Sequence, residues 1–243
     1  MELTIGTFVL INFILVVSSI LQMVTGVTAG MIIVPLLAMI SYTLIPVPIA
    51  FASLALTIMM TYKGRNHIDT TNIFPIAVGM VAGILFSIFI LKNIELKYMG
   101  VVFGSAILIA VYFSIKIPTF ILTKKISYAG GFIAGIMGAT AAVGGKVIAL
   151  LFQNHPLESL KATLAFLYTL FSLVMLLIFF AFGEFSSSQF ISGFYMMPGF
   201  IIGFFVAPLF SKYFNPTYSK TVVLLMATLG SLILIGKSLS PLF

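Results

Sequence analysis

The sequence predicts an all-α protein that crosses a membrane several times. Of its 243 residues, 61% are hydrophobic and only 7% are charged, and the mean hydropathy is +1.26. A soluble domain carries about 25% charged residues. Apolar stretches of about 20 residues, long enough to cross a hydrocarbon core of about 30 Å, recur along almost the whole chain. The composition leaves no room for a soluble domain, and the alternating pattern of barrel strands is absent.

The apolar segments divide the chain into two halves of similar layout. They are expected at residues 4–24, 29–45, 47–62, 71–91, 98–115, 127–143, 147–153, 159–182, 188–210 and 217–236. In each half an interrupted helix pair precedes three full spans, and the basic stretch 116–125 joins the halves. We therefore predict one integral membrane domain with about eight transmembrane spans, built from an N-terminal repeat, 1–117, and a C-terminal repeat, 118–243.

Glycines interrupt the first pair of segments in each half. The first interruption is Gly26–Gly30, and the second is Gly144–Lys146. Lipid tolerates irregular backbone only where protein or a water-filled cavity satisfies its polar groups. Two broken helices in matching positions of two halves are the best sequence indication of a transporter's binding site. Three alternatives stay open for each helix pair: two crossings of the membrane, a re-entrant hairpin, or one kinked span.

The loop charges predict that the two repeats are inverted. When the loop of Lys63 and Arg65 is placed inside, the loops 116–125 and 212–220 also fall inside. Eight lysines and arginines then lie inside and three outside, with both termini outside and Lys146 at membrane depth. The two three-span bundles run in opposite directions. We expect a multi-pass protein of the inner or plasma membrane, whose first apolar segment is a resident span and not a cleaved signal.

Lys146 is the sharpest candidate for a substrate-binding residue. A lysine at membrane depth costs several kcal/mol unless it is paired, hydrated or snorkelling. Contact with a substrate and snorkelling to the inner interface are the two interpretations. The other candidates border the interruptions and are Gly144, Gly145, Gly26, Gly30, Thr25, Thr28, Thr140 and Gln22. The threonines either bond an oxyanion or cap freed carbonyls, and Gln22 either faces a cavity or bonds a neighbouring helix.

Both histidines lie near short polar loops. His67 and Asp69 follow a span, where a proton relay competes with the favoured reading of a solvated loop. His155 could control access, although Pro156 and Glu158 also fit an ordinary helix start.

Nothing in the sequence indicates catalysis. Two histidines about 88 positions apart and sparse carboxylates make no metal site, and no catalytic or nucleotide-binding motif is present. The chain has no cysteine. We predict no catalytic residue, no metal and no cofactor, so the protein is not expected to be an enzyme. The net charge of +7 indicates topology signals and not nucleic-acid binding. The expected partners are a small anionic substrate and the lipid bilayer, and a homodimer is an open alternative.

The two interruptions resemble a known family. Gly26-Val27-Thr28-Ala29-Gly30, followed by Val34-Pro35-Leu36-Leu37, resembles the N-half signature of the TauE/SafE family of sulfite and organosulfonate permeases, close to G-x-G-G-G and then V-P-x-L. The run from Gly131 to Gly144-Gly145 is similar to the C-half copy, G-x-G-G-P. The chain departs from the pattern, since Thr28, Ala29 and Ala142 replace glycines and Lys146 replaces proline. The resemblance implies a carrier for small sulfur-containing or related organic anions, often working outward.

The residues themselves favour an anion but do not indicate sulfur. Half-helix N-termini present unpaired N–H groups, and the ammonium of Lys146 adds a full charge. We predict a secondary transporter for sulfite, an organosulfonate or a related sulfur-containing or organic anion, working by alternating access. The alternatives are a non-catalytic membrane assembly component and an intramembrane enzyme. Without an ATP-binding module the transporter needs a coupling ion or works by facilitated diffusion, and no intramembrane carboxylate is available as a proton carrier.

Overall fold

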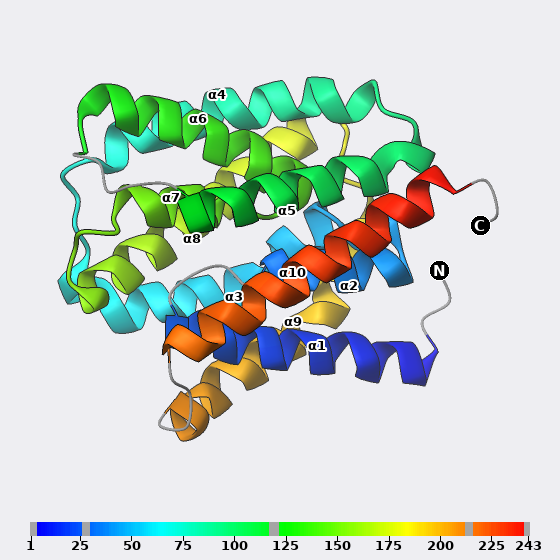
Figure 1. Ribbon diagram of the computed structural model, residues 1–243, viewed down its shortest axis with the longest axis horizontal. Coiled ribbons are helices and arrows are strands. Elements are labelled where there is room, and N and C mark those ends of the chain that lie inside the picture. Colours follow the sequence, from blue (N-terminus) through cyan, green and yellow to red (C-terminus); the bar gives the residue numbers. More distant parts are fainter. Residues whose placement is uncertain (1–3, 26–29, 117–121, 212–215, 241–243) are drawn as a thin grey trace.

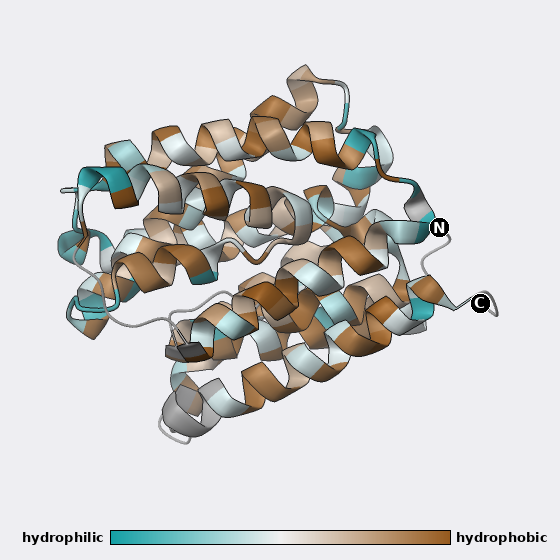
Figure 2. Cartoon of the chain, turned by 45° about the horizontal axis from the view of Figure 1, so that its top comes forward, coloured by the Kyte–Doolittle hydropathy of each residue, from teal (hydrophilic) through white to brown (hydrophobic). Residues whose placement is uncertain are grey.

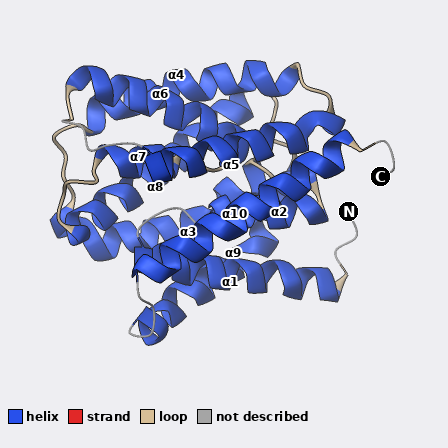
Figure 3. Ribbon diagram, in the orientation of Figure 1, coloured by secondary structure: helices blue, strands red, loops and turns tan. Residues whose placement is uncertain are grey.

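The fold is all-helical, as the sequence predicts (Figure 1, Figure 3). The computed structural model describes residues 4–25, 30–116, 122–211 and 216–240, and these residues contain no strand. The α-helices are α1 (Ile5–Thr25), α2 (Gly30–Ile40), α3 (Val47–Gly64), α4 (Ile73–Lys92), α5 (Met99–Lys116), α6 (Lys124–Ala141), α7 (Gly145–Leu151), α8 (Leu157–Ala181), α9 (Ser187–Ser211) and α10 (Pro216–Leu239). Short 3-10 turns at Tyr42–Leu44, Arg65–His67 and Leu96–Tyr98 connect some of them.

The helix lengths and surfaces are those of a polytopic membrane protein. In the described part of the chain, α1, α3, α4, α8, α9 and α10 each contain a stretch long and apolar enough to cross a membrane, while α2 and α5 contain shorter apolar stretches. Apolar residues colour the helices along their lengths, and hydrophilic ones gather near the two ends of the bundle (Figure 2). Large apolar side chains such as Phe13, Phe89 and Leu177 face outward. The number of spans, about eight, stays a prediction.

Most helices run between two ends of the molecule, which differ in charge. At the basic end, which carries Lys63, Arg65, Lys124 and Lys125, the α3–α4 connection lies next to the starts of α6 and α8 (Figure 1). Ser127 of α6 bonds Asn72 there at 3.4 Å. At the opposite end Tyr42 bonds Ser238 at 3.5 Å, and the ion pair between Lys92 and Glu184 measures 3.2 Å.

Local sequence features mark two of the helix starts at the basic end. The Thr123 hydroxyl accepts a hydrogen bond from the N–H of Ile126 at 3.3 Å, which is an N-cap for α6. Pro156 precedes α8, whose first turn contains Glu158. Negative charge in that turn is favourable for the helix dipole, so the helix start expected at this proline is confirmed.

Glycines allow α4 and α6 to pack backbone against backbone. A Cβ atom on Gly79 or Gly83 of α4 would collide with carbonyl oxygens of α6, and a Cβ on Gly131 of α6 would collide with the Ile76 carbonyl of α4. The corresponding glycines of α9 lie against α1, where a Cβ on Gly203 would collide with Ser19. Each glycine therefore occupies a position with no room for a side chain.

A polar side chain fastens α1 to α9. The Asn12 side-chain oxygen accepts the N–H of Gly199 at 2.7 Å, and its amide donates to the Tyr195 carbonyl at 3.0 Å. Asn12 thus bonds both members of one i, i+4 backbone pair of α9. Such bonds between helices are the usual role of amides in membrane bundles.

The most extensive helix contacts join elements before residue 117 to elements after residue 118. They are the pairs α4 with α6, α1 with α9, α3 with α8, α3 with α9, and α5 with α10. When each helix of the first five is exchanged with its counterpart in the second five, these pairs map onto one another, except that α3 with α9 becomes the weaker contact of α4 with α8. The two halves are interleaved, and their origin as repeats stays a prediction.

Gly83→Ala should destabilise the bundle. The new methyl would lie in the α4–α6 contact, 2.9 Å from both the Gly135 Cα and the Ile136 nitrogen, and overpacking of this kind costs about 1–3 kcal/mol. Thermal unfolding in detergent measures the effect. Gly236→Ala, where the Cβ meets no atom within 4 Å, is the matched control and should be neutral or stabilising. Equal unfolding temperatures for both variants would contradict close α4–α6 packing.

Candidate functional site

The second interruption is a capped helix end followed directly by a short helix. The N–H of Ala142 bonds the Gly138 carbonyl at 2.9 Å, and the N–H of Val143 bonds the Met137 carbonyl at 3.2 Å. The first of these is the hydrogen bond of the αL C-cap motif, whose left-handed position is usually glycine, yet here that position is held by Ala142 with φ of +53°. A break between α6 and α7 is confirmed, but it lies at residues 142–144 and not at the predicted Gly144–Lys146, because Gly145 and Lys146 already belong to α7. Gly26, Thr28 and the side chain of Thr25 lie outside the described residues.

The two interruptions meet through backbone atoms. A Cβ on Gly30, the first residue of α2, would collide with the Ala142 carbonyl oxygen, and a Cβ on Gly144 would collide with the Ala134 carbonyl oxygen. Both positions therefore require glycine for close approach. The broken helices of the two halves thus touch where Gly30 meets Ala142, whereas the Gly144 contact packs the start of α7 against α6 within the second half.

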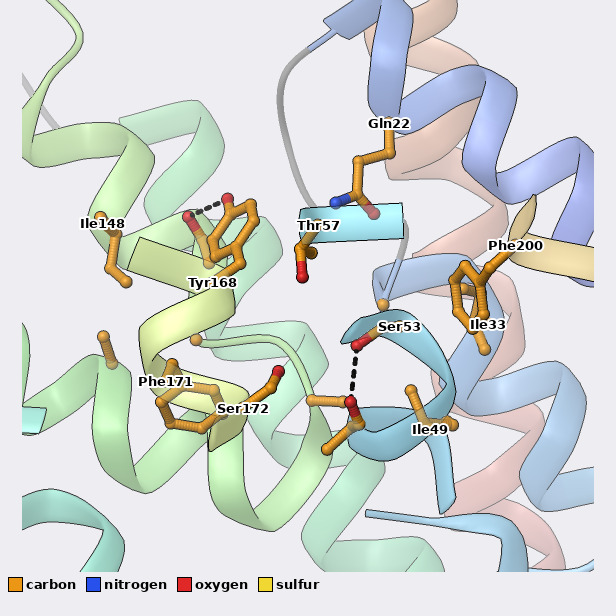
Figure 4. Close-up of a pocket in the computed structure, with 17 residues that line it drawn as sticks. Gln22, Ile33, Ile49, Ser53, Thr57, Ile148, Tyr168, Phe171, Ser172 and Phe200 are labelled. Carbon is orange, nitrogen blue, oxygen red and sulfur yellow. Dashed lines mark hydrogen bonds between the residues drawn. The ribbon is translucent and has the colours of Figure 1, made fainter. Parts of the chain in front are cut away.

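A cavity of about 70 Å³ lies beside this meeting point (Figure 4). Its wall is mostly apolar and comes from both halves of the chain. The residues that line it are Gln22, Gly30, Ile33, Ile49, Ala50, Ser53, Thr57, Ala134, Gly138, Ala142, Gly144, Gly145, Ile148, Tyr168, Phe171, Ser172 and Phe200. This volume holds a few water molecules or a ligand of a few heavy atoms.

The sequence candidates divide between the cavity wall and its surroundings. Gln22, Gly30, Gly144 and Gly145 line the cavity. Lys146 and Thr140 are not in its wall. Thr140 is buried and donates to the Ile136 carbonyl of its own helix at 2.7 Å, whereas Lys146 is buried in the first turn of α7, directly after Gly145.

Four hydroxyl groups reach the cavity from uninterrupted helices. Ser53 and Thr57 are four residues apart on α3, and Tyr168 and Ser172 are four residues apart on α8. This spacing places both members of each pair on one helix face. None of these four residues was predicted from the sequence, although isolated polar residues inside apolar spans are a signal by which they could have been identified.

The hydroxyl of Ser172 differs from the other three. Ser53 donates to the Ala50 carbonyl at 3.0 Å, Thr57 to the Leu54 carbonyl at 3.4 Å, and Tyr168 to the Gly145 carbonyl at 3.0 Å. The Ser172 side chain is buried and makes no hydrogen bond to any described residue. Its hydroxyl is placed to serve a ligand without breaking an existing bond.

The electrostatic character of the site favours an anion over a cation. No described residue in the cavity wall is a carboxylate, and the described residues contain no group of three potential metal ligands. The first turn of α2 borders the cavity at Gly30 and Ile33. The N–H groups of a first helical turn lack intrahelical partners and form the positive end of the helix dipole.

The polar loops at the basic end form a contact between the halves. The Asp69 carboxylate lies 2.9 Å from Nε2 of His155, and the Asp69 N–H donates to the Thr163 hydroxyl at 2.8 Å. The hydroxyl and N–H of Thr71 donate to the carboxylate at 2.6 and 2.9 Å, and these bonds hold the pKa of Asp69 below its usual range. Asp69 is therefore not the residue of a freely solvated loop, as the sequence analysis favoured.

An interleaved helical bundle with two broken helices meeting beside a buried cavity is the architecture of a membrane transporter. The chain belongs to the sulfite exporter TauE/SafE family, whose family model matches residues 11–234. No curated protein and no solved structure matches the chain.

Membership of this family confirms the predicted class. The protein is a multi-pass membrane transporter for a small anionic substrate and is not an enzyme. The intramembrane enzyme and the assembly component, which the sequence analysis kept as alternatives, are therefore wrong. The family match covers both interruptions and all but the ends of the chain.

Gly144→Ala should destabilise the interruption, whereas Ala142→Gly should be tolerated. The methyl at 144 would also lie 2.8 Å from the Gly138 nitrogen, where only backbone could yield, so we expect a loss of about 1–3 kcal/mol. At position 142 glycine adopts the left-handed conformation without the cost, about 1–2 kcal/mol, that other residues carry. Thermal unfolding of both variants provides the measurement, and a larger loss from Ala142→Gly would refute the described geometry.

Proposed function

We propose that the protein is a secondary transporter that moves sulfite, an organosulfonate or a related sulfur-containing or organic anion across the cell membrane by alternating access. The observation that carries this proposal is the cavity beside the contact between the broken helices of both halves, with the buried Ser172 hydroxyl available to a ligand. Its small volume suits a compact anion in this conformation. Family membership supports the anionic substrate.

The proposed site combines backbone, hydroxyl and charged groups. Gly26, Gly30, Gly144 and Gly145 let the main chain approach the anion closely. Gln22 and Ser172 donate hydrogen bonds to it from the wall. Ser53 and Thr57 can rotate their hydroxyl groups toward a bound anion, because the hydroxyl hydrogen is free to turn. Thr25, Thr28 and Thr140 belong to the borders of the same site.

Lys146 contributes positive charge to this site although it does not line the cavity. Its side chain is buried, and its backbone directly follows Gly145, which lines the cavity. Charges interact more strongly in a buried environment that is poor in water than they do in bulk water. The ammonium therefore offsets the charge of a bound anion without direct contact in this conformation.

The two repeats, 1–117 and 118–243, supply the moving parts in this proposal. Because the extensive helix contacts join the two halves, access alternates by movement along these contacts. By the positive-inside rule the basic end faces the cytoplasm, so the protein lies in an inner or plasma membrane with its opposite end outside.

Small anions should stabilise the purified protein. A ligand present at about a hundred times its dissociation constant adds about 2.7 kcal/mol to the free energy of unfolding, and a series of sulfite, sulfate, thiosulfate, sulfonates and carboxylates identifies the preferred anion by its thermal shift. Ser172→Ala and Lys146→Gln should each weaken the preferred anion by roughly ten- to a hundredfold, because a hydrogen bond or counter-charge to an ion is worth about 1.5–3 kcal/mol.

Lys146→Arg should give an intermediate affinity, since a planar fork and a point charge are not interchangeable. Ser87→Ala is the matched control. Ser87 is a buried serine that bonds the carbonyl of Ile84 at 2.7 Å and lies outside the cavity wall. Anion stabilisation that is unchanged in Ser172→Ala and in Lys146→Gln would refute the assigned site.

Cysteine labelling should place the basic end in the cytoplasm. The natural chain has no cysteine, so single variants report without background. A membrane-impermeant maleimide added outside intact cells should react with Ser186→Cys and spare Lys63→Cys and Lys124→Cys, which should react only after permeabilisation. Labelling of Lys63→Cys from outside would reverse the proposed orientation.

A further inference from the structure

Both histidines of the chain face carboxylates of the other half at the basic end. The sequence contains only two histidines and five acidic residues. His67 of the first half lies 3.8 Å from Glu158 of the second, and His155 of the second half lies 2.9 Å from Asp69 of the first. The contact is reciprocal, and it gathers all the imidazole groups of the protein at one junction.

The two pairs differ in burial and in support. The side chains of His67 and Glu158 are 55% and 81% exposed, and ion pairs so exposed to solvent contribute little. Those of His155 and Asp69 are only 28% and 22% exposed. Asp69 is also bonded through its N–H to Thr163 of α8 and is oriented by Thr71. We call the group of Asp69, His155 and Thr163 the latch.

The latch lies beyond the cavity along α3 and α8. Thr57 and Tyr168 line the cavity, and at the level of Tyr168 the hydroxyls of Thr61 of α3 and Thr169 of α8 lie 3.2 Å apart. Seven residues separate Thr57 from Gly64, which is about 10 Å along a helix. There a Cβ on Gly64 would lie 2.9 Å from the Ala162 Cβ. Helices α3 and α8 are thus in close contact between the cavity and the basic end, and the latch holds the loops just beyond.

A different kind of contact lies between α3 and α8 toward the opposite end. Val47, Met175 and Phe179 belong to one buried apolar cluster there. An apolar contact does not respond to protons, whereas the latch contains a titratable pair. The ion pair between Lys92 and Glu184 at the opposite end contains no imidazole, so both groups that ordinarily change charge between about pH 5 and pH 8 lie at the basic end.

We propose that the latch is a proton-sensitive closure of the basic end, held shut when His155 is protonated and loosened when His155 loses its proton. The proposal rests on the proposed alternating access, since it assigns the group that controls one of the two exits. Imidazole is the side-chain group that changes charge between about pH 5 and pH 8. A charge-assisted hydrogen bond is roughly twice as strong as a neutral one. When His155 loses its proton, its hydrogen bond to Asp69 therefore remains but becomes weaker.

The other charged groups at the junction do not replace either partner of the latch. Arg65 lies 4.5 Å over the Tyr62 ring and donates to the Tyr62 carbonyl at 2.9 Å, and Lys63 lies 5.9 Å over the Phe204 ring. On α8, Glu158 pairs with His67, while the half-buried Lys161 is in none of the ion pairs between described residues. Lys124 and Lys125 at the start of α6 are exposed. Among the described carboxylates, only Asp69 and Glu158 belong to this end.

The two ring nitrogens of His155 lie in different surroundings. Nε2 faces Asp69, while Nδ1 is buried and has no hydrogen-bond partner among the described residues. Protonation turns Nδ1 from an acceptor into a donor, and a small rotation of the ring, which is about a quarter exposed, brings it to water. Phe152 packs edge-on against the ring at 5.1 Å and limits larger movements.

Site-directed labelling tests the latch. Thr57→Cys places a thiol of similar size in the cavity wall, and its labelling from the basic end is measured in oriented vesicles relative to Lys124→Cys at the same pH, which corrects for thiol ionisation. We expect this relative rate to rise roughly tenfold or more between about pH 5.5 and pH 8. Asp69→Asn should label fast at both pH values, and His155→Gln, which retains a donor but cannot titrate, should lose the pH dependence.

His67→Asn is the matched control, because it removes the exposed histidine from the same junction and should keep the pH dependence. A pH-independent rate in the Thr57→Cys parent, or a pH dependence that survives in His155→Gln, would overturn the proposal. Thermal unfolding of each variant identifies any folding defect. If Asp69→Asn is defective, the labelling rate of His155→Gln decides whether the latch is proton-sensitive. Protection of the Thr57→Cys thiol by the preferred anion tests the proposed function separately. A pH-dependent labelling rate without anion protection would contradict the proposed function, and anion protection without a pH-dependent rate would contradict the latch.

Discussion

The structure depends on the contact between Gly30 and the carbonyl group of Ala142. An interrupted helix inside an apolar bundle exposes backbone groups that lipid cannot satisfy, so the interruption survives only where other parts of the protein enclose it. The backbone hydrogen bonds of Ala142 and Val143 to carbonyls of α6 satisfy part of this need. The rest comes from the approach of the other half, which the missing side chain of Gly30 permits. The cavity exists because two such interruptions are placed together.

The sequence predicted the helical segments well because hydrophobic length and glycine breaks are local signals. The existence of a break between α6 and α7, though not its exact bounds, the start of α8 after Pro156 and the family membership all followed from residues that are adjacent in the chain. The cavity was predicted only in part. Gln22 and the glycines were found because they border the breaks, while Ser172 and Tyr168 lie in an intact span and acquire a role only when α8 packs against α3. The pair of Asp69 and His155, 86 positions apart, depends on the same tertiary packing.

The two closures of the path between α3 and α8 illustrate how polar and apolar contacts divide their tasks. The apolar cluster of Val47, Met175 and Phe179 excludes water without direction, and any movement that separates the helices opens it gradually. The hydrogen-bonded group around Asp69 has defined donors and acceptors, and the proposed closure of the basic end depends on these particular partners. A transporter needs both properties, since its substrate must be isolated from water and its exits must not open together.

The interleaving of the halves also has a consequence for the order in which the chain can assemble. Asn12 of α1 finds its partner at Gly199, 187 residues later. During synthesis α1 therefore enters the bilayer long before α9 exists, and the Asn12 amide then has only the Phe8 carbonyl of its own helix, at 3.0 Å, as a partner. Contacts of such sequence separation are slow to form, and early helices wait with their packing faces uncovered. The first helix to be made is thus among the last to be secured, and the insertion machinery or a transient neighbour must shield its polar face until the second half arrives.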